Sequence, residues 1–201
     1  GSGNDIYCQK INTNMEKIFD EEGLAVSTTS DLETTPRTTY MKNDTSFIIW
    51  QSGTESTDIY YNLLTSNGLV FSEPLQLCTY SSSKASPRVK RNQLGHVFVQ
   101  WTDYRNDLTE GNHYYQKISN GGSIIWDQDG VQLDQEGDDH HARFSPGMNG
   151  EVYIYWERGT FPNVDIMYQA IQSDGLLLLD SAEYISNISG YQSMPNTISD
   201  N

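Results

Sequence analysis

The stretch Asp58-Ile59-Tyr60-Tyr61-Asn62-Leu63-Leu64 decides the fold, because it returns three more times along the chain. Its counterparts begin at Asp5, Asn112 and Asp165, so the four copies are 53, 54 and 53 residues apart. A fixed period of this length indicates a repeat architecture, which has to be read before any single residue. The functional question therefore becomes what a stack of similar units presents on its surface.

Each unit contains four short runs rich in β-branched and aromatic residues. In one unit they cover residues 87–90, 96–101, 113–118 and 123–133. The runs are too short for helices and are typical of β-strands. The third and fourth runs are joined by Asn67-Gly68, Asn120-Gly121-Gly122 and Asp174-Gly175 in successive units. Such pairs favour the positive φ angles of a tight hairpin, although the first unit has Asn14-Met15 instead.

The second run of each unit ends in a tryptophan: Trp50, Trp101 or Trp156. Apolar residues precede it on both alternating faces, which indicates a strand covered on both sides. We therefore predict an all-β fold, a β-propeller-type array of four-stranded antiparallel blades stacked face to face. A ligand-stacking ladder is an alternative role for the tryptophans, but packing between blades is the expectation.

The repeat register predicts one array of about four blades. The expected divisions are a partial blade at 1–32, blades at 33–84, 85–142 and 143–193, and the start of another at 194–201. One buried strand of the broken unit is missing, which would leave open strand edges in a closed ring. The register thus favours an arc of a larger propeller within a longer parent chain over a complete four-bladed ring.

The composition excludes several classes of partner. With 27 acidic and 12 basic residues the formal net charge is −15, so phosphate backbones and anionic lipid would be repelled. No apolar run approaches the roughly 20 residues that span a bilayer, so membrane insertion is not expected. Cys8 and Cys78 occupy different positions in the unit and are interpreted as small buried residues, with a bridge between them as the alternative.

One unit resembles a known family of repeats. Trp101-Thr102-Asp103-Tyr104-Arg105, then Tyr114-Tyr115-Gln116-Lys117, Asn120-Gly121 and Asp129-Gly130-Val131 are similar to a Trp-x-Asp-x-Arg, Asp-Ile-Tyr-x-Gln, Asn-Gly unit. Such repeats are typical of secreted surface proteins of Bacteroidetes-like bacteria, often cargo of type IX secretion. The resemblance implies an extracellular or cell-surface location. The Trp-x-Asp-x-Arg motif is intact only in the third unit, so a ligand that needs it in every blade is put in doubt.

Candidate binding residues follow from strand direction. The loops after the second and fourth strands should emerge on one face and carry the variable residues, where sites gather over a rigid scaffold. The residues expected there are Asp103, Tyr104, Arg105, Asp138, Asp139, His140, Glu157, Arg158 and Phe161. Residues 138–141 could form a metal site or a solvated polar loop. The loop is expected, because no spacing typical of metal ligands recurs in the sequence. No metal or cofactor is therefore predicted.

These observations favour a non-catalytic module that binds a protein or a glycan at the cell surface, with no catalytic residues. One alternative is a glycosidase-like, glycan-processing propeller in which acidic loop residues such as Asp103 and Glu157 act as a carboxylate pair. Another is a structural spacer. The sequence lacks an Asp-box, a nucleophile elbow, a phosphate loop and a dinucleotide fingerprint.

Overall fold

The computed structural model shows an all-β chain with no helix among the residues it describes, which are 3–106, 108–109, 111–133, 139–186 and 188–197; of 139 and 140 it describes the backbone. The strands are β1 (Ile6–Cys8), β2 (Leu24–Ser27), β3 (Glu33–Tyr40), β4 (Ser46–Ser52), β5 (Asp58–Thr65), β6 (Gly68–Leu69), β7 (Leu75–Gln76), β8 (Lys84–Arg91), β9 (Val97–Asp103), β10 (Asn112–Ile118), β11 (Val131–Gln132), β12 (Asp139–Pro146), β13 (Val152–Thr160), β14 (Asn163–Ile171) and β15 (Glu183–Ser186).

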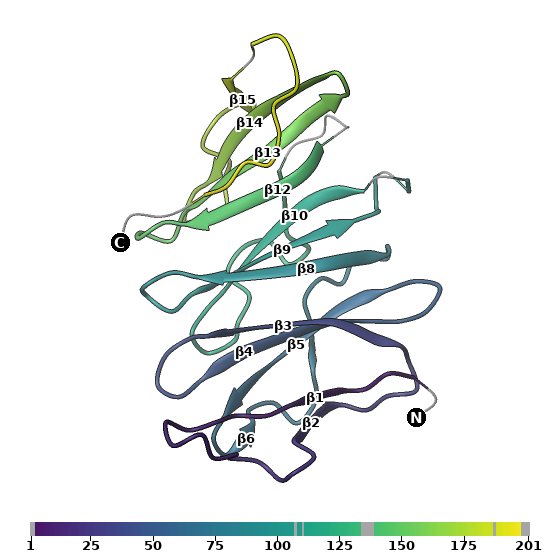
Figure 1. Ribbon diagram of the computed structural model, residues 1–201, viewed down its shortest axis with the longest axis vertical. Helices are drawn as coiled ribbons and strands as arrows, with labels where there is room; N and C mark the ends of the chain where they lie inside the picture. The colour runs from purple at the N-terminus through teal and green to yellow at the C-terminus, as the bar shows by residue number, and fades with distance from the viewer. Residues whose placement is uncertain (1–2, 107, 110, 134–138, 187, 198–201) are drawn as a thin grey trace.

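The strands form four antiparallel sheets in chain order. They are β1–β2, β3 to β7, β8 to β11 and β12 to β15. Figure 1 shows them stacked along the long axis of the molecule, with β1 and β2 at one end and β13 to β15 at the other. The repeated segment of the sequence supplies β1, β5, β10 and β14, so the sequence period is the period of the stack.

The hairpin turns follow the predicted chemistry. Gly68, Gly122 and Gly175 have φ values of 110°, 85° and 93° in the turns that the Asn-Gly and Asp-Gly pairs predict. In the first unit Met15 takes the same role with φ 65°, so the turn keeps its shape although the sequence departs from the pattern. The backbone geometry of the unit, rather than its glycine, is what repeats.

Packing between neighbouring sheets makes the core. Trp50, Trp101 and Trp156 are 0–1% exposed and belong to three successive apolar clusters. The side chains of β4 and β5 pack on those of β9, and the side chains of β9 and β10 pack on those of β12 and β13. Tyr61 fastens two sheets by donating a hydrogen bond to the carbonyl oxygen of Gly122 at 2.8 Å.

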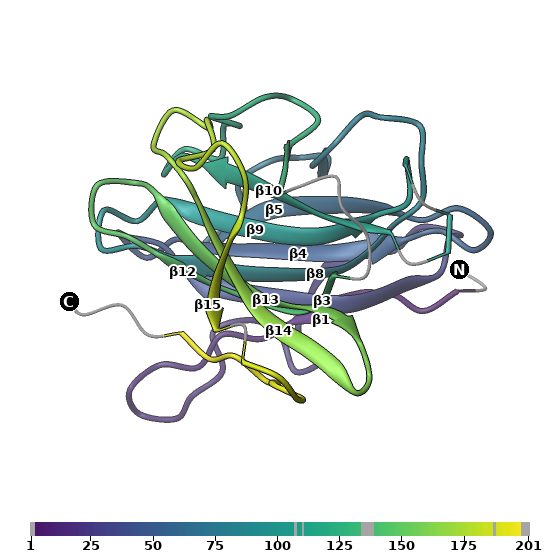
Figure 2. The ribbon, with the colours of Figure 1, turned by 90° about the horizontal axis from the view of Figure 1, so that it is seen from above.

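One strand of each of the three larger sheets lies on a common side of the molecule. Figure 2 shows β3 and β8 along one side, β4 and β9 in the middle and β5 and β10 on the other. The Cα atoms of β8 come within 8 Å of Cα atoms on both β3 and β12. We call β3, β8 and β12 the inner strands. The four sheets form an open row and no closed ring is present among the described residues, so the all-β, sheet-stack part of the fold prediction is what the structure shows.

Candidate functional site

The Trp-x-Asp-x-Arg motif folds into a buried polar network at the end of β9. Asp103 is fully buried, and its carboxylate accepts hydrogen bonds from Ser82 Oγ at 2.7 Å, Trp101 Nε1 at 3.2 Å and Arg105 Nη2 at 2.7 Å. Burial alone would raise the pKa of Asp103, but these bonds outweigh it and hold the pKa below its ordinary value. The carboxylate is therefore ionised and occupied by the protein itself.

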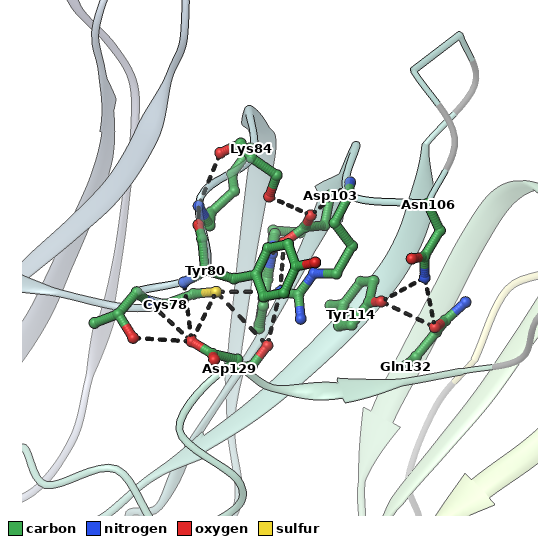
Figure 3. Close-up of polar contacts among 12 residues, drawn as sticks. Cys78, Tyr80, Lys84, Asp103, Asn106, Tyr114, Asp129 and Gln132 are labelled. Atoms are coloured by element: carbon green, nitrogen blue, oxygen red, sulfur yellow. Dashed lines mark hydrogen bonds and ion pairs between the residues drawn. The ribbon is translucent and has the colours of Figure 1, made fainter.

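Arg105 joins that carboxylate to the neighbouring sheet. Its Nη2 atom also donates to the carbonyl oxygen of Asp129 at 2.9 Å and to the sulfur of Cys78 at 3.2 Å. The guanidinium lies 4.4 Å from the ring centroid of Tyr80 and 4.0 Å from that of Tyr114, between two aromatic faces. Figure 3 shows Cys78, Tyr80, Asp103, Tyr114 and Asp129 gathered in this network.

Lys84, also labelled in Figure 3, has the same structural role. Lys84 is fully buried and its ammonium group donates to Asp58 at 2.8 Å and to the carbonyl oxygens of Tyr80 and Ser82 at 2.6 and 2.9 Å. Contacts between residues 82 and 103 bring the loop after β7 against the loop after β9, as strand direction predicts. These groups fix one sheet on the next.

The other predicted loop residues are distributed without forming one site. Tyr104 lines a cavity of about 330 Å³ together with residues 81–83, Arg105 and Leu108. Phe161 is 80% exposed at the tip of the β13–β14 hairpin and meets the edge of Tyr191, while Arg158 lies 5.6 Å from the Trp156 ring. Asp138 lies outside the described residues, and for Asp139 and His140 only the backbone is described.

The expected carboxylate pair does not share a cavity in the described structure. Asp103 belongs to the Arg105 network, whereas Glu157 accepts hydrogen bonds from His141 Nδ1 at 2.9 Å and from the backbone nitrogen of Met194. Neither residue lines the 330 Å³ cavity or a larger groove of about 1290 Å³ on the uncovered face of the last sheet. Glycoside hydrolysis by this pair therefore has no geometric support.

A second polar site lies on the inner strands, where each strand carries a β-bulge. The bulges fall between Thr34 and Arg37, between Ala85 and Arg88, and between His140 and Arg143. Each contains a residue with positive φ two positions before an arginine, at 51° for Thr35, 56° for Ser86 and 51° for His141. A bulge re-aims the side chains that follow it, so the three arginines occupy equivalent positions.

The bulge of β12 brings an imidazole and two guanidinium groups together. His141 has a side chain that is 57% exposed, and Glu157, only 4% exposed, holds its Nδ1 atom. Arg143 donates to the carbonyl oxygens of His141 and Ala142 at 3.3 and 3.1 Å, and Arg88 reaches across from β8 to the same Ala142 oxygen at 3.2 Å. The two guanidinium groups thus converge on the backbone beside the imidazole.

Sequence analysis selected Glu157 as a loop residue and considered His141 only as a metal ligand, and it missed Arg88 and Arg143, although one signal for the arginines was present. Pro36-Arg37 and Pro87-Arg88 occupy the same place in the first strand of two units, and Arg143 follows at the corresponding place in the next. The alignment alone does not say whether an arginine there is buried or exposed. No group of three or more His, Cys, Asp or Glu side chains suited to a metal occurs in the described parts of the chain.

The comparisons give a fold but no family. No family model and no curated protein matches the sequence. A solved structure with a similar fold is a "new family of polysaccharide lyase PL25", an ulvan lyase bound to -[GlcA(1-4)Rha3S]-; the TM-score is 0.60 at 7% identity, over 89% of this chain and 50% of that one. A second structure of a PL25 ulvan lyase gives a TM-score of 0.54 at 6% identity, over 88% and 45%.

These findings correct the functional expectation. Identities of 6–7% show the fold alone, and this chain spans about half the length of the structures it resembles. Both similar structures are nevertheless polysaccharide lyases, which contradicts the expectations of a non-catalytic module and of no enzyme activity. The glycan-processing alternative agrees better with the comparisons than the binding module does. No helix in the described part of the chain has the length and apolarity to span a membrane.

Proposed function

We propose that this chain belongs to a glycan-processing enzyme that cleaves uronate-containing polysaccharide by β-elimination at the inner strands. The observation that carries the proposal is the exposed imidazole of His141, held by Glu157, beside the guanidinium groups of Arg143 and Arg88. These groups lie on a fold that resembles two polysaccharide lyases, one of them with a ligand that includes a uronate unit. A carboxylate neutraliser next to a base is the arrangement that proton abstraction beside a carboxylate requires.

The chemistry can be written from these residues. Guanidinium groups of Arg88 and Arg143 hold the uronate carboxylate and stabilise the negative charge that develops when the neighbouring C5 loses its proton. With Nδ1 donating to Glu157, the neutral imidazole of His141 has its lone pair on Nε2, which accepts that proton. The C5 electron pair forms the C4–C5 double bond as the C4–O bond breaks, and the imidazolium returns the proton to the leaving oxygen.

We also infer that the four sheets are an arc of a β-propeller continued by further units. Phe47 and Phe98 are 0–1% exposed because the next sheet covers them, whereas Tyr153, their equivalent on β13, is 42% exposed. Tyr153 therefore occupies a position that a following blade would cover. An extracellular or surface location fits a substrate of polymer size, and it remains part of the proposal together with the bacterial repeat family.

The test is an elimination assay on the 201-residue chain. Polyuronates and sulfated uronate polysaccharides are supplied, and the unsaturated uronate product is followed by its ultraviolet absorbance. Replacing His141 with Ala should lower kcat/KM by roughly 10²–10⁴-fold, the usual contribution of a general base. His96→Gln is the matched control, because it removes an imidazole just before β9, outside the inner strands. Equal activity in His141→Ala and the unmodified chain, or no product from any uronate polymer, would overturn the proposal.

A further inference from the structure

The charges of the chain are distributed very unevenly over its strands. The three inner strands contain 24 of the 201 residues, yet they carry six of the 12 Lys and Arg residues and only two of the 27 Asp and Glu residues. β8 alone, with the sequence KASPRVKR, has four cations and no acid. A chain with a net charge of −15 thus presents a positive band along one side. Clustered charge of one sign raises the local concentration of ions of the opposite sign.

Packing does not explain the arginines of this band. Arg37, Arg88 and Arg143 pair in register with the residue before each buried tryptophan, so one arginine recurs per sheet. Arg37 and Arg88 are exposed and Arg143 is half-buried. Within the described residues none of the three forms an ion pair, and the hydrogen bonds that their guanidinium groups donate there go to backbone carbonyl oxygens. Lys84, by contrast, is buried and fully bonded, so it is outside the row.

The guanidinium groups of Arg88 and Arg143 meet at the carbonyl oxygen of Ala142, and Arg37 lies on the inner strand next to that of Arg88. Neighbouring inner strands approach within 8 Å between Cα atoms. Partial desolvation lowers the pKa of Arg88 although the residue is exposed, and the positive charges of Arg143 and Arg37 lower it further, so both neighbours on the row act on it. Lys90 extends the band, 5.6 Å from the ring of Phe144. Like charges held near one another repel, so an anion that bridges them is stabilised.

We propose that Arg37, Arg88 and Arg143 form a track for a polyanionic glycan that crosses the inner strands and places one carboxylate or sulfate group on each sheet. Guanidinium forks suit this role because they bind planar or tetrahedral oxyanions through two parallel hydrogen bonds. The track deepens the proposed function, which rests on His141, by assigning Arg37 to a subsite away from the reacting bond. Its ligand class is an acidic polysaccharide with a charged group at regular intervals.

Nucleic acid is the competing polyanion, and the rest of the chain disfavours it. A duplex carries one charge per roughly 1.7 Å of its axis and would bring many phosphates near a chain whose formal net charge is −15. A glycan chain carries fewer charges per length and can place them at the spacing of the sheets. Its binding should weaken steeply with salt, because exposed pairs are screened beyond about 10 Å at 0.1 M.

Binding is measured with the His141→Ala chain, so that no turnover disturbs it. The probes are polygalacturonate and dextran sulfate, with neutral dextran and a DNA duplex for comparison. Arg37→Gln should weaken binding of at least one acidic glycan about ten-fold, the loss expected for one charge-assisted hydrogen-bonding group. Lys17→Gln removes an exposed cation far along the chain from the inner strands and is the matched control, with unchanged affinity. In the chain that keeps His141, Arg37→Gln should raise KM about ten-fold and leave kcat within two-fold of its original value.

The outcomes separate the two proposals. Loss of glycan binding in Arg37→Gln together with no elimination product from any polymer keeps the track and removes the lyase. Unchanged glycan affinity in Arg37→Gln, an equal loss in Lys17→Gln, or equally tight binding of DNA with the same arginine dependence overturns the track. Because Arg37 is exposed and, among the described residues, its guanidinium donates to the neighbouring Pro36 carbonyl oxygen alone, its replacement should leave the melting temperature unchanged and the result interpretable.

Discussion

Replacing Arg105 with Ala should destabilise the fold more than any surface substitution. The side chain of Arg105 is 9% exposed and that of Asp103 is fully buried, with 2.7 Å between Nη2 and the carboxylate oxygen. Removal of the guanidinium leaves a buried carboxylate with Ser82, Trp101 and one backbone amide as donors. Breaking a buried pair from one side costs about 3–5 kcal/mol. For a domain of this size that corresponds to a fall in Tm of roughly 6–20 °C.

Thermal and urea unfolding of Arg105→Ala, Arg105→Lys and Arg37→Ala measure this. Arg105→Lys keeps the charge but lacks the fork that also reaches Asp129, so its loss should be intermediate. Arg37→Ala removes an exposed arginine and should stay within about 0.5 kcal/mol of the unmodified chain. A loss below about 1 kcal/mol for Arg105→Ala would show that the network is dispensable and would refute the structural role given to the motif.

The same network predicts a dependence on pH. The folded-state pKa of Asp103 is lowered, so the stability it contributes is complete above its unfolded value near 3.9 and is lost as the pH falls below that value toward the folded pKa. Without Arg105 the carboxylate keeps the raising effect of burial and loses its strongest donor. The difference in unfolding free energy between the unmodified chain and Arg105→Ala should therefore narrow as the pH falls below about 4.

Two further predictions concern buried ionisable groups. Burial raises the pKa of Tyr61 to about 12, so the contribution of its neutral hydroxyl to stability is complete below pH 10 and is lost between about pH 10 and 12. In urea unfolding, Tyr61→Phe should lower the free energy of unfolding by about 1 kcal/mol. An unchanged free energy in this variant would show that the hydrogen bond to Gly122 contributes nothing. Cys8 and Cys78 are free thiols whose pKa values are raised by burial, and Cys78 is fully buried. A disulfide-exchange reagent should therefore label Cys8 faster in the native chain and label both after unfolding, whereas no labelling in denaturant would indicate a bridge.

The backbone of the repeat could be predicted because its causes are local. Period, alternation and turn residues located the strands, and Met15 shows that the turn persists where the glycine is absent. The tryptophans could be placed in the core because a strand apolar on both faces has to be covered on both. The contacts between sheets are a different matter, since they depend on which side chains meet across a gap that no sequence period encodes.

The Trp-x-Asp-x-Arg motif illustrates that limit. Charged residues in a long loop predict a binding site, yet the structure places Asp103 and Arg105 in a closed network. Another junction uses different groups, since Glu33 bonds Ser27 and Thr29 between the first two sheets, and Lys84 with Asp58 adds a second polar pair at the junction of the motif itself. The motif therefore varies between units because several polar pairs can join two sheets. Its absence from a unit says nothing about a ligand.

Recurrence in a repeat has two physical causes, and exposure separates them. The tryptophan recurs because each sheet needs a large side chain between itself and the next, and burial of 99% or more accounts for it fully. The inner-strand arginine also recurs once per sheet, but Arg37 and Arg88 are exposed, have no acidic partner among the described residues and raise the electrostatic energy of their neighbours. A feature that repeats at an energetic cost to the free protein is stabilised by something outside it. The anionic glycan proposed for the inner strands would be such a partner.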